Sequence, residues 1–165
     1  MKPSAFFYLV VCFLFWLVNT RSVPANQKPC TMAEEKQAID EVDHLKDWNA
    51  LHRSFIRFSN CDDGAIAEGY SEAVGRLLAL DWGRIGILAK LVASDDKFES
   101  FVLRHIDERL PKEMLDTIAN NATKSCPATE TVLCGKMLQR TQDATHAKWK
   151  KLRNETGYFP GTRVD

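Results

Sequence analysis

Neither sign of charge is in excess in this chain, in which 22 lysines and arginines face 22 aspartates and glutamates. Lys2 and Arg21 lie in an N-terminal segment with the features of a secretory signal, and without it 20 basic residues remain against 22 acidic ones. Proteins that bind nucleic acid need a basic surface to displace counterions from phosphates. A net charge of about −2 therefore excludes nucleic acid as the expected partner, and it gives no reason to expect attachment to anionic lipid.

The chain also lacks the pattern of β-strands and any strong internal repeat. No short segment alternates strictly between apolar and polar side chains, and the β-branched residues fall within helical periods. The 140 residues that follow the N-terminal segment are the usual size of one domain with one core. We therefore expect an all-α fold, a bundle of five or six short helices stapled by two disulfides.

The N-terminal apolar run is too short to span a bilayer. It covers residues 5–18, which is 14 residues, whereas a spanning helix needs about 20. A preceding Lys2 and the following Val23-Pro24-Ala25 make it a secretory signal, so we expect an exported protein, periplasmic or secreted, with no stable membrane insertion after cleavage. The expected division of the chain is a signal peptide over 1–25, a helical domain over 26–155 and an irregular C-terminal tail over 156–165.

Four cysteines remain once Cys12 has left with the signal peptide: Cys30, Cys61, Cys126 and Cys134. In an exported protein two disulfides are expected in preference to a metal site, and four cysteines allow three pairings. We favour Cys61 with Cys126, which would clamp the central helical region, and Cys30 with Cys134, which would tie the N-terminus to the last helix. Each bridge should stabilise the fold by about 2 to 4 kcal/mol.

Apolar residues recur three and four positions apart through most of the chain, which is typical of amphipathic helices. Asp81, the Ser94-Asp95-Asp96 segment and Pro111 are expected helix starts, and Cys126-Pro127 ends a helix. The expected helices cover 34–58, 65–80 and about 131–153, with three more between them. Of these three, one begins at Asp81, one at Ser94-Asp95-Asp96, and one runs from Pro111 until Cys126-Pro127 ends it.

The first and last of these helices differ in charge. Acidic side chains dominate the first, at Glu34, Glu35, Asp40, Glu41, Asp43 and Asp47, and basic ones the last, at Lys136, Arg140, Lys148, Lys150, Lys151 and Arg153. Opposite charges favour the two helices as neighbours, although exposed pairs add only about 0 to 1 kcal/mol each. The alternative is two solvated faces of opposite sign.

One acidic group stands out, formed by Asp62, Asp63, Glu68 and Glu72. Glu68 and Glu72 lie four residues apart and so project from the same side of a helix that Asp62 and Asp63 begin. Such carboxylates can hold a hard cation or act as an acid and base pair. The alternative is that acidic residues at a helix start stabilise its macrodipole.

No catalytic residue, metal site or cofactor is predicted. His105 lies on an apolar helix face, and we expect a partly buried, hydrogen-bonded histidine. His44 and His52 are eight apart, too far for the helical zinc pair of metalloproteases, and the Gly-x-Ser-x-Gly motif of hydrolases is missing. The glycines at 69, 75, 83 and 86 are expected to allow close contact between helices.

A candidate interaction surface lies near the basic C-terminal end, where we single out Trp149, Lys150, Arg153 and Tyr158. Tryptophan, tyrosine and arginine are the types that most often anchor protein interfaces. The alternative is that these side chains pack onto the body of the domain. With no catalytic group predicted, binding of a protein partner is the expected function.

Residues 51–127, and within them 60–70 (NCDDGAIAEGY) and 101–107 (FVLRHID), resemble small exported bacterial proteins of unassigned function. In layout the chain is similar to the periplasmic immunity proteins of interbacterial toxin systems, which are short, helical and often disulfide-bonded. This resemblance implies a partner that attacks the cell wall or the membrane and is neutralised by occlusion of its active site.

Two other functions remain open at this point. A secreted carrier of small apolar ligands, similar to the four-cysteine odorant-binding proteins of insects, fits the size and the helices, but their close cysteine spacing is absent. A hydrolase that uses Glu68, Glu72 or His105 is the third reading.

Overall fold

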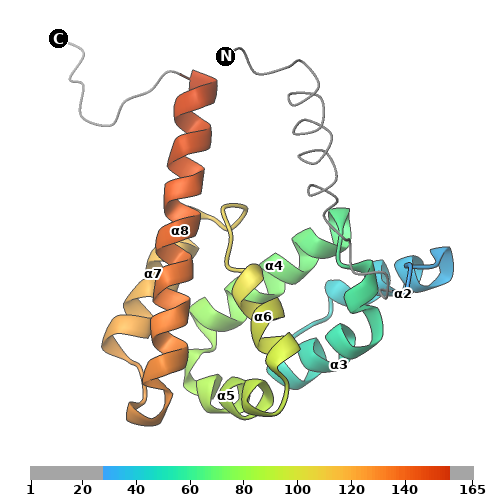
Figure 1. The fold of residues 1–165 in the computed structure, drawn as a ribbon, viewed down its shortest axis with the longest axis horizontal. Coiled ribbons are helices and arrows are strands. Elements are labelled where there is room, and N and C mark those ends of the chain that lie inside the picture. The colour runs from blue at the N-terminus through green and yellow to red at the C-terminus, as the bar shows by residue number, and fades with distance from the viewer. Residues whose placement is uncertain (1–27, 157–165) are drawn as a thin grey trace, which may run out of the picture.

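Residues 28–156 are described by the computed structural model, and within that range the protein consists of helices and turns without a strand (Figure 1). The all-α class and the presence of two disulfides are thereby confirmed. The expected signal peptide over 1–25, most of the expected tail, and Tyr158 lie outside the described residues. The helices are α2 (Met32–Val42), α3 (Trp48–Phe58), α4 (Gly64–Leu80), α5 (Ile85–Ser94), α6 (Asp96–Arg104), α7 (Lys112–Lys124) and α8 (Thr131–Thr156).

The single helix expected over 34–58 is in fact two, α2 and α3. Asp47 has extended backbone angles and caps α3, because its side chain accepts a hydrogen bond from the amide of Ala50 at 2.8 Å. Leu45, in the connection, is only 2% exposed and continues the apolar stripe through the break. The apolar spacing therefore continues across the break between α2 and α3, although Asp47 begins a new helix there.

Acidic and hydroxyl side chains begin several of the helices. Thr31 and Glu34 form a capping box at α2, and the Asp95 carboxylate accepts from two amides at the start of α6. Asp81 behaves differently from the expectation, because it ends α4 and makes no side-chain cap; a 3-10 turn follows, and α5 begins at Ile85. Pro111 occupies the N-cap position of α7, one residue before the first turn.

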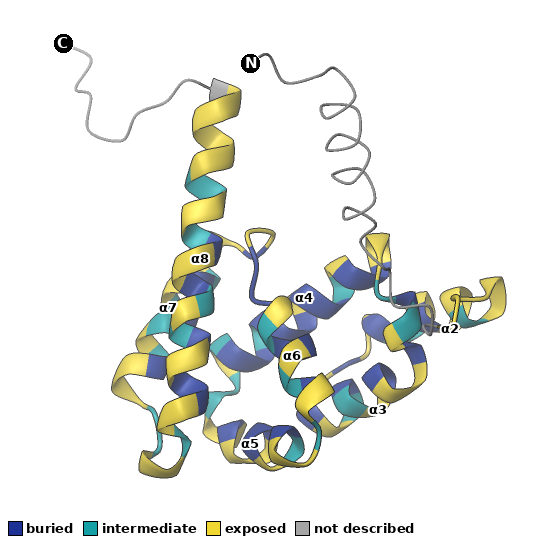
Figure 2. Cartoon of the chain, viewed as in Figure 1, coloured by how far each residue is buried: buried dark blue, intermediate teal, exposed yellow. Residues whose placement is uncertain are grey.

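The core forms around α4, which contacts α2 along one part of its length and α7 along another. The α7 helix pairs with α8, while α5 contacts α3 and α6. Figure 2 shows that the buried residues of these helices face one another. The largest side chains that are almost fully buried include Trp48, Tyr70, Phe98 and Phe101.

Two glycines of α4 permit these close approaches. A Cβ on Gly69 would lie 2.7 Å from Cγ2 of Val42 in α2. One on Gly75 would collide with Met114 of α7 and with Leu110, which precedes that helix. The expectation of close helix contact is confirmed for these two. It is wrong for the glycines at 83 and 86, where an added Cβ meets nothing within 4 Å.

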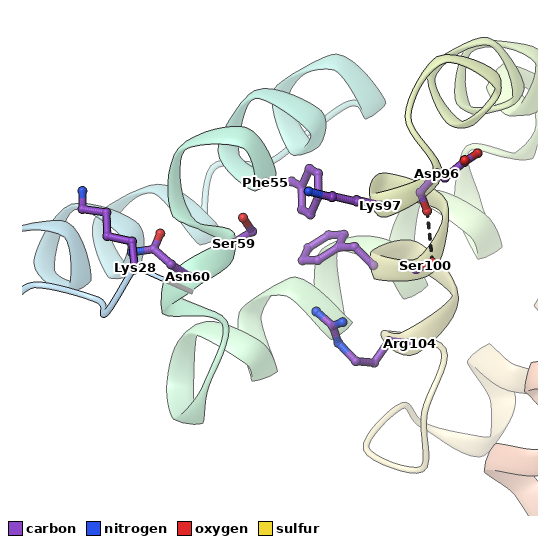
Figure 3. A pocket seen from close by; sticks show the side chains of 9 residues that line it. Lys28, Phe55, Ser59, Asn60, Asp96, Lys97, Ser100 and Arg104 are labelled. Atoms are coloured by element: carbon purple, nitrogen blue, oxygen red, sulfur yellow. Dashed lines mark hydrogen bonds between the residues drawn. The ribbon is translucent and has the colours of Figure 1, made fainter. Parts of the chain in front are cut away.

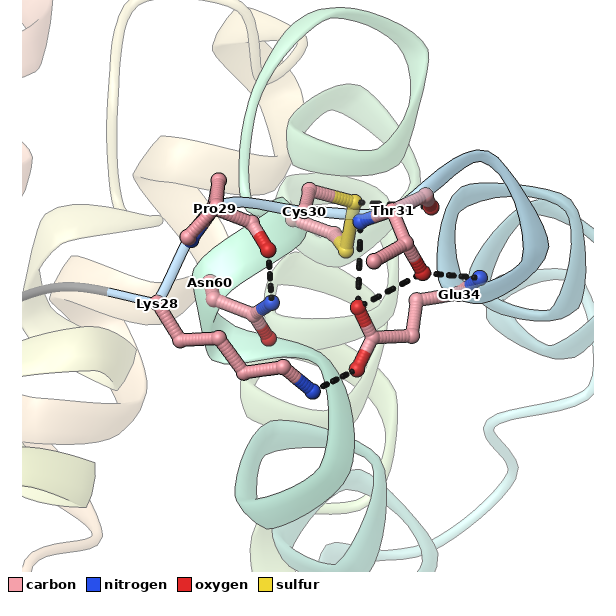
Figure 4. Close-up of a disulfide and its surroundings, with 7 residues drawn as sticks. Lys28, Pro29, Cys30, Thr31, Glu34 and Asn60 are labelled. Carbon is pink, nitrogen blue, oxygen red and sulfur yellow. Dashed lines mark hydrogen bonds and ion pairs between the residues drawn. A yellow bond between two sulfur atoms is a disulfide. The ribbon is translucent and has the colours of Figure 1, made fainter.

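The disulfides join Cys30 to Cys61 and Cys126 to Cys134, so the favoured pairing is wrong. Figure 4 shows the bridge at Cys30. Cys61 lies three residues before the start of α4. Cys126 follows α7, whose Asn121 side chain reaches the carbonyls at the far end of α4. The 17 residues of α4 span about 25 Å, which separates Cys61 from Cys126. Each bridge instead closes a connection between neighbouring elements, with Cα atoms 4.9 and 6.2 Å apart.

The acidic and basic helices are not neighbours, contrary to the expectation from their charges. The main contacts of α2 are with α3 and α4, and those of α8 are with α7 and α6, so the two lie on different sides of the domain (Figure 1). Each of the two helices forms ion pairs with a neighbouring helix instead. Glu41 of α2 pairs with Arg57 of α3, and Lys136 of α8 pairs with Glu99 of α6. The remaining charges of both helices are largely solvated.

No helix within residues 28–156 combines the length and the apolar character that crossing a membrane requires.

Candidate functional site

The four carboxylates singled out in the sequence have three different positions. The Asp62 side chain is 5% exposed and hydrogen-bonded to His105. Asp63 caps α4, where its carboxylate accepts from the amide of Gly64 at 2.7 Å. Glu68 and Glu72 are exposed one turn apart on α4. No group of three or more metal-binding side chains comes together in the described part of the chain.

A buried polar network links the start of α4 to the segment after α6. His105 Nε2 lies 3.2 Å from Oδ2 of Asp62, and its Nδ1 lies 3.0 Å from the hydroxyl of Ser71. The Ser71 hydroxyl donates to Asp107 at 3.0 Å, and Asp107 also accepts from Arg109 at 2.8 Å. Ser71 and His105 are each 1% exposed, so this network runs through the interior.

Both acids of the network are held in the ionised form. Burial by itself would raise the pKa of Asp62, but the hydrogen bond and charge of His105, and then those of Arg104, outweigh it and lower the pKa. Burial also opposes ionisation of Asp107, and the hydrogen bonds from Arg109 and Ser71 lower its pKa. The carboxylates are therefore charged, paired and mostly out of contact with water near neutral pH.

Ser71, His105 and Asp62 have the connectivity of a catalytic triad, but their surroundings do not suit nucleophilic attack. Ser71 lies in the middle of α4, where the neighbouring amides are engaged in helix hydrogen bonds and cannot form an oxyanion hole. Its hydroxyl donates to Asp107 and is almost wholly buried. The network thus fixes the segment after α6 against α4, and the prediction of a hydrogen-bonded His105 is confirmed.

An open hollow of about 460 Å³ lies beside this network, between α4 and the start of α7. Its polar lining consists of Glu68, Ser71, Glu72 and Arg109, and its apolar wall is formed by Leu110, Pro111 and Met114. Arg109 is already paired with Asp107, whereas the two glutamates face solvent.

A larger groove, about 590 Å³, lies between α3 and α6 (Figure 3). We call it the α3/α6 groove; the residues that line it are Lys28, Phe55, Ser59, Asn60, Asp96, Lys97, Ser100, Phe101 and Arg104. Its floor is aromatic and its rim carries three cations. The floor is firmly supported, because Phe55 and Phe101 have ring centroids 4.9 Å apart and lie 8% and 1% exposed.

Aromatic contacts join the floor of the groove to the buried network. Phe101 packs edge-on against Tyr70 and His105, with ring centroids 4.9 and 4.4 Å away. Tyr70 is hydrogen-bonded to Ser54 at 3.0 Å, and its burial raises the pKa of the phenol to about 12. Arg104 belongs to both regions, because its guanidinium lies 5.7 Å from the Phe101 ring and pairs with Asp62.

The end of α8 forms a third exposed region. Lys148 donates to the carbonyl of Leu110 at 3.0 Å, and beyond it Trp149 is half-buried while residues 150–155 are all exposed. Of the interaction residues singled out in the sequence, Lys150 and Arg153 therefore face solvent, and Trp149 is partly covered. Figure 2 shows this end of the helix projecting past its neighbours.

A scan against protein-family models finds no match, and searches of curated proteins and of solved structures find none either. The resemblance to periplasmic immunity proteins therefore stays a prediction.

Sequence reasoning assigned no role to Ser71, and it treated Arg104 and Asp107 only as the charged neighbours of His105. Ser71 has the spacing of an ordinary helix residue, and its role appears only when α4 meets a segment more than 30 residues later. The run from Arg104 to Asp107 did carry a signal, because it places two charged residues around a histidine on an otherwise apolar face. This pattern indicates that His105 has polar partners, but it does not identify them.

Proposed function

We propose that this chain is an exported helical domain that acts by binding another protein, as an immunity or inhibitor protein does for a toxin that works outside the cytoplasm. The observation that carries the proposal is the exposed end of α8. Buried positions recur along this helix up to Ala144, and none follows among residues 145–155. The helix nevertheless continues for about three more turns.

An isolated helical segment is only marginally stable in water, because most helix stability in proteins comes from packing. Residues 145–155 of α8 contain no buried position, so packing stabilises this end less than the rest of the helix. This end presents Lys150, Lys151 and Arg153 around the half-buried Trp149. Tryptophan and arginine side chains supply much of the binding energy at protein interfaces, and an inhibitor needs a projecting element to occlude an active site.

Two disulfides and the expected signal peptide support export. The bridges close loops of 31 and 8 residues, and such covalent links help a domain keep a fixed surface outside the reducing cytoplasm. The partner on this proposal is an effector directed at the cell wall or the membrane, and its active site is the region covered.

The carrier function has less support from the described residues. A carrier encloses most of the surface of its ligand in an apolar cavity. The α3/α6 groove and the hollow beside α7 are both open, and charged side chains stand at the rim of each. The hydrolase function would use Glu68, Glu72 or His105. The two glutamates are exposed on α4, whereas His105 is 1% exposed and hydrogen-bonded within the interior.

Site-specific photocrosslinking tests the proposal. The oxidised mature chain would carry benzoylphenylalanine at position 150, on the projecting end of α8, or at position 90, an exposed lysine of α5, as the control. Each would be irradiated with the exported proteins of the cells that produce it. We expect one defined protein adduct from position 150 and none from position 90. Equal labelling from both positions, or a small molecule retained in native mass spectrometry without any adduct, would overturn the proposal.

A further inference from the structure

We infer that the α3/α6 groove is a docking site for an acidic segment of the partner protein, with an apolar side chain placed over the aromatic floor. The inference rests on the proposed function only in taking the ligand to be a protein. It assigns to the body of the domain a second contact, separate from the end of α8.

The cations of the rim come from two sides of the groove. Lys28 precedes α2, and Lys97 and Arg104 stand two turns apart on α6. In Figure 3 the side chain of Lys97 extends from α6 toward Phe55 of α3, while the carboxylate of Asp96 points away from the groove. Lys97 and Arg104 thus face the space that a ligand would enter, and Lys28 stands at its edge with its ammonium on Glu34.

These cations retain donors for a ligand. Lys97 is exposed and forms no ion pair with the described residues. Arg104 pairs with Asp62, whose side chain is 5% exposed and lies behind the rim, yet 57% of the Arg104 side chain stays exposed. A guanidinium has five N–H donors in a fixed fork, so it binds a second carboxylate from the solvent side. The side chain of Lys28 is 70% exposed and forms one ion pair, with Glu34.

The side chains of the α3/α6 groove are held in place by other residues of the domain, so the site is preorganised. Arg104 is oriented by Asp62 and by the Phe101 ring, and the floor is packed against the buried aromatic residues. A preorganised site loses little side-chain entropy on binding, which favours affinity. Its volume of about 590 Å³ fits a few side chains of a short segment, within the usual range for ligand sites.

Peptide binding tests the inference. A fluorescent peptide of alternating glutamate and phenylalanine would be titrated into the oxidised mature chain, with a lysine and phenylalanine peptide of equal length as its counterpart. We expect saturable binding of the acidic peptide only. Lys97→Glu should weaken it about tenfold, because attraction at the rim becomes repulsion. Lys90→Glu makes the same charge change on exposed α5 and should leave binding unchanged.

The inference fails if the acidic peptide does not saturate, if the basic peptide binds equally well, or if Lys97→Glu binds as tightly as the unaltered chain. Amide chemical shifts give an independent readout, with changes expected at Ser59 and Ser100 and not at the projecting end of α8. Loss of peptide binding together with a retained crosslink from position 150 would reject the groove and leave the proposed function standing. A bound peptide without any protein adduct would reject the proposed function instead.

Discussion

Asp62 and His105, which are 43 residues apart in the sequence, lie with Oδ2 and Nε2 at 3.2 Å in the interior of the domain. Asp62 precedes α4, and His105 ends α6. Their contact fixes the side of α6 that carries Arg104, and therefore one wall of the α3/α6 groove. The buried network thus has a consequence at the surface, because it sets the direction in which a cation of the rim points.

Asp62→Asn should lower the free energy of unfolding by about 2 to 3 kcal/mol, because a charge-assisted buried hydrogen bond is lost while the shape is kept. Asp63→Asn is the matched control. Asp63 is exposed and serves as an N-cap, a position at which asparagine is as effective as aspartate. Urea unfolding of both variants would measure the difference. Equal midpoints would show that the Asp62 and His105 contact contributes nothing.

Stability should decline in acid below about pH 4, and Asp62 and Asp107 should account for part of the decline. The folded state holds the pKa of both acids below the ordinary value of 3.8. A lowered pKa stabilises the folded state above the unfolded pKa, and the contribution is lost as the pH falls through the folded one. Urea unfolding between pH 3 and pH 6 is the measurement, and Asp62→Asn should flatten the profile. A profile as steep as that of the unaltered chain would contradict this account.

Ser71→Ala should cost about 1 to 3 kcal/mol, since it removes the hydroxyl that connects His105 to Asp107 and leaves both buried groups short of a partner. Ser100→Ala on the exposed surface of α6 removes only a hydroxyl that donates to its own helix, to the carbonyl of Asp96. Its effect should be small. Thermal unfolding of the two variants would distinguish a connecting role for Ser71 from the generic effect of losing a serine.

The two disulfides should differ in what they contribute. Their sequence separations are 31 and 8 residues, so the chain-entropy account gives about 4 kcal/mol for Cys30–Cys61 and about 2.5 kcal/mol for Cys126–Cys134. Replacing each pair by serine and comparing the free energies of unfolding measures this. Peptide mapping without reduction checks the pairing itself, and a Cys61–Cys126 peptide would refute it.

Helical periodicity was enough to predict the fold class, since apolar spacing marked the faces that pack in α3, α4 and α6. It did not predict the break between α2 and α3, because Leu45 kept the stripe in register while Asp47 began a new helix. The disulfide pairing could not be predicted from the sequence for a different reason. It depends on which end of α4 each cysteine approaches, and that follows from tertiary contacts and not from any local pattern.

The candidate site was predicted only in part for the same reason. Glu68 and Glu72 share a helix face that spacing alone reveals. Asp62 was grouped with them by proximity in the sequence, yet its partner His105 comes from another helix. The groove is formed by side chains of α3, of the 3-10 turn that follows it and of α6, with Lys28 from before α2, and no sequence pattern indicates such an assembly.

Gly69→Ala should destabilise the domain by about 1 to 3 kcal/mol through overpacking. The new Cβ would lie 2.9 Å from Cβ of Val42, an atom next to the backbone of α2, so relief requires the helix itself to shift. Gly135→Ala in α8 is the control, because an added Cβ there meets nothing within 4 Å. It should stabilise the domain by about 0.5 to 1 kcal/mol, since alanine favours a helix over glycine. Opposite signs in urea unfolding would establish that α2 and α4 touch at Gly69, and a stabilising Gly69→Ala would show that they do not.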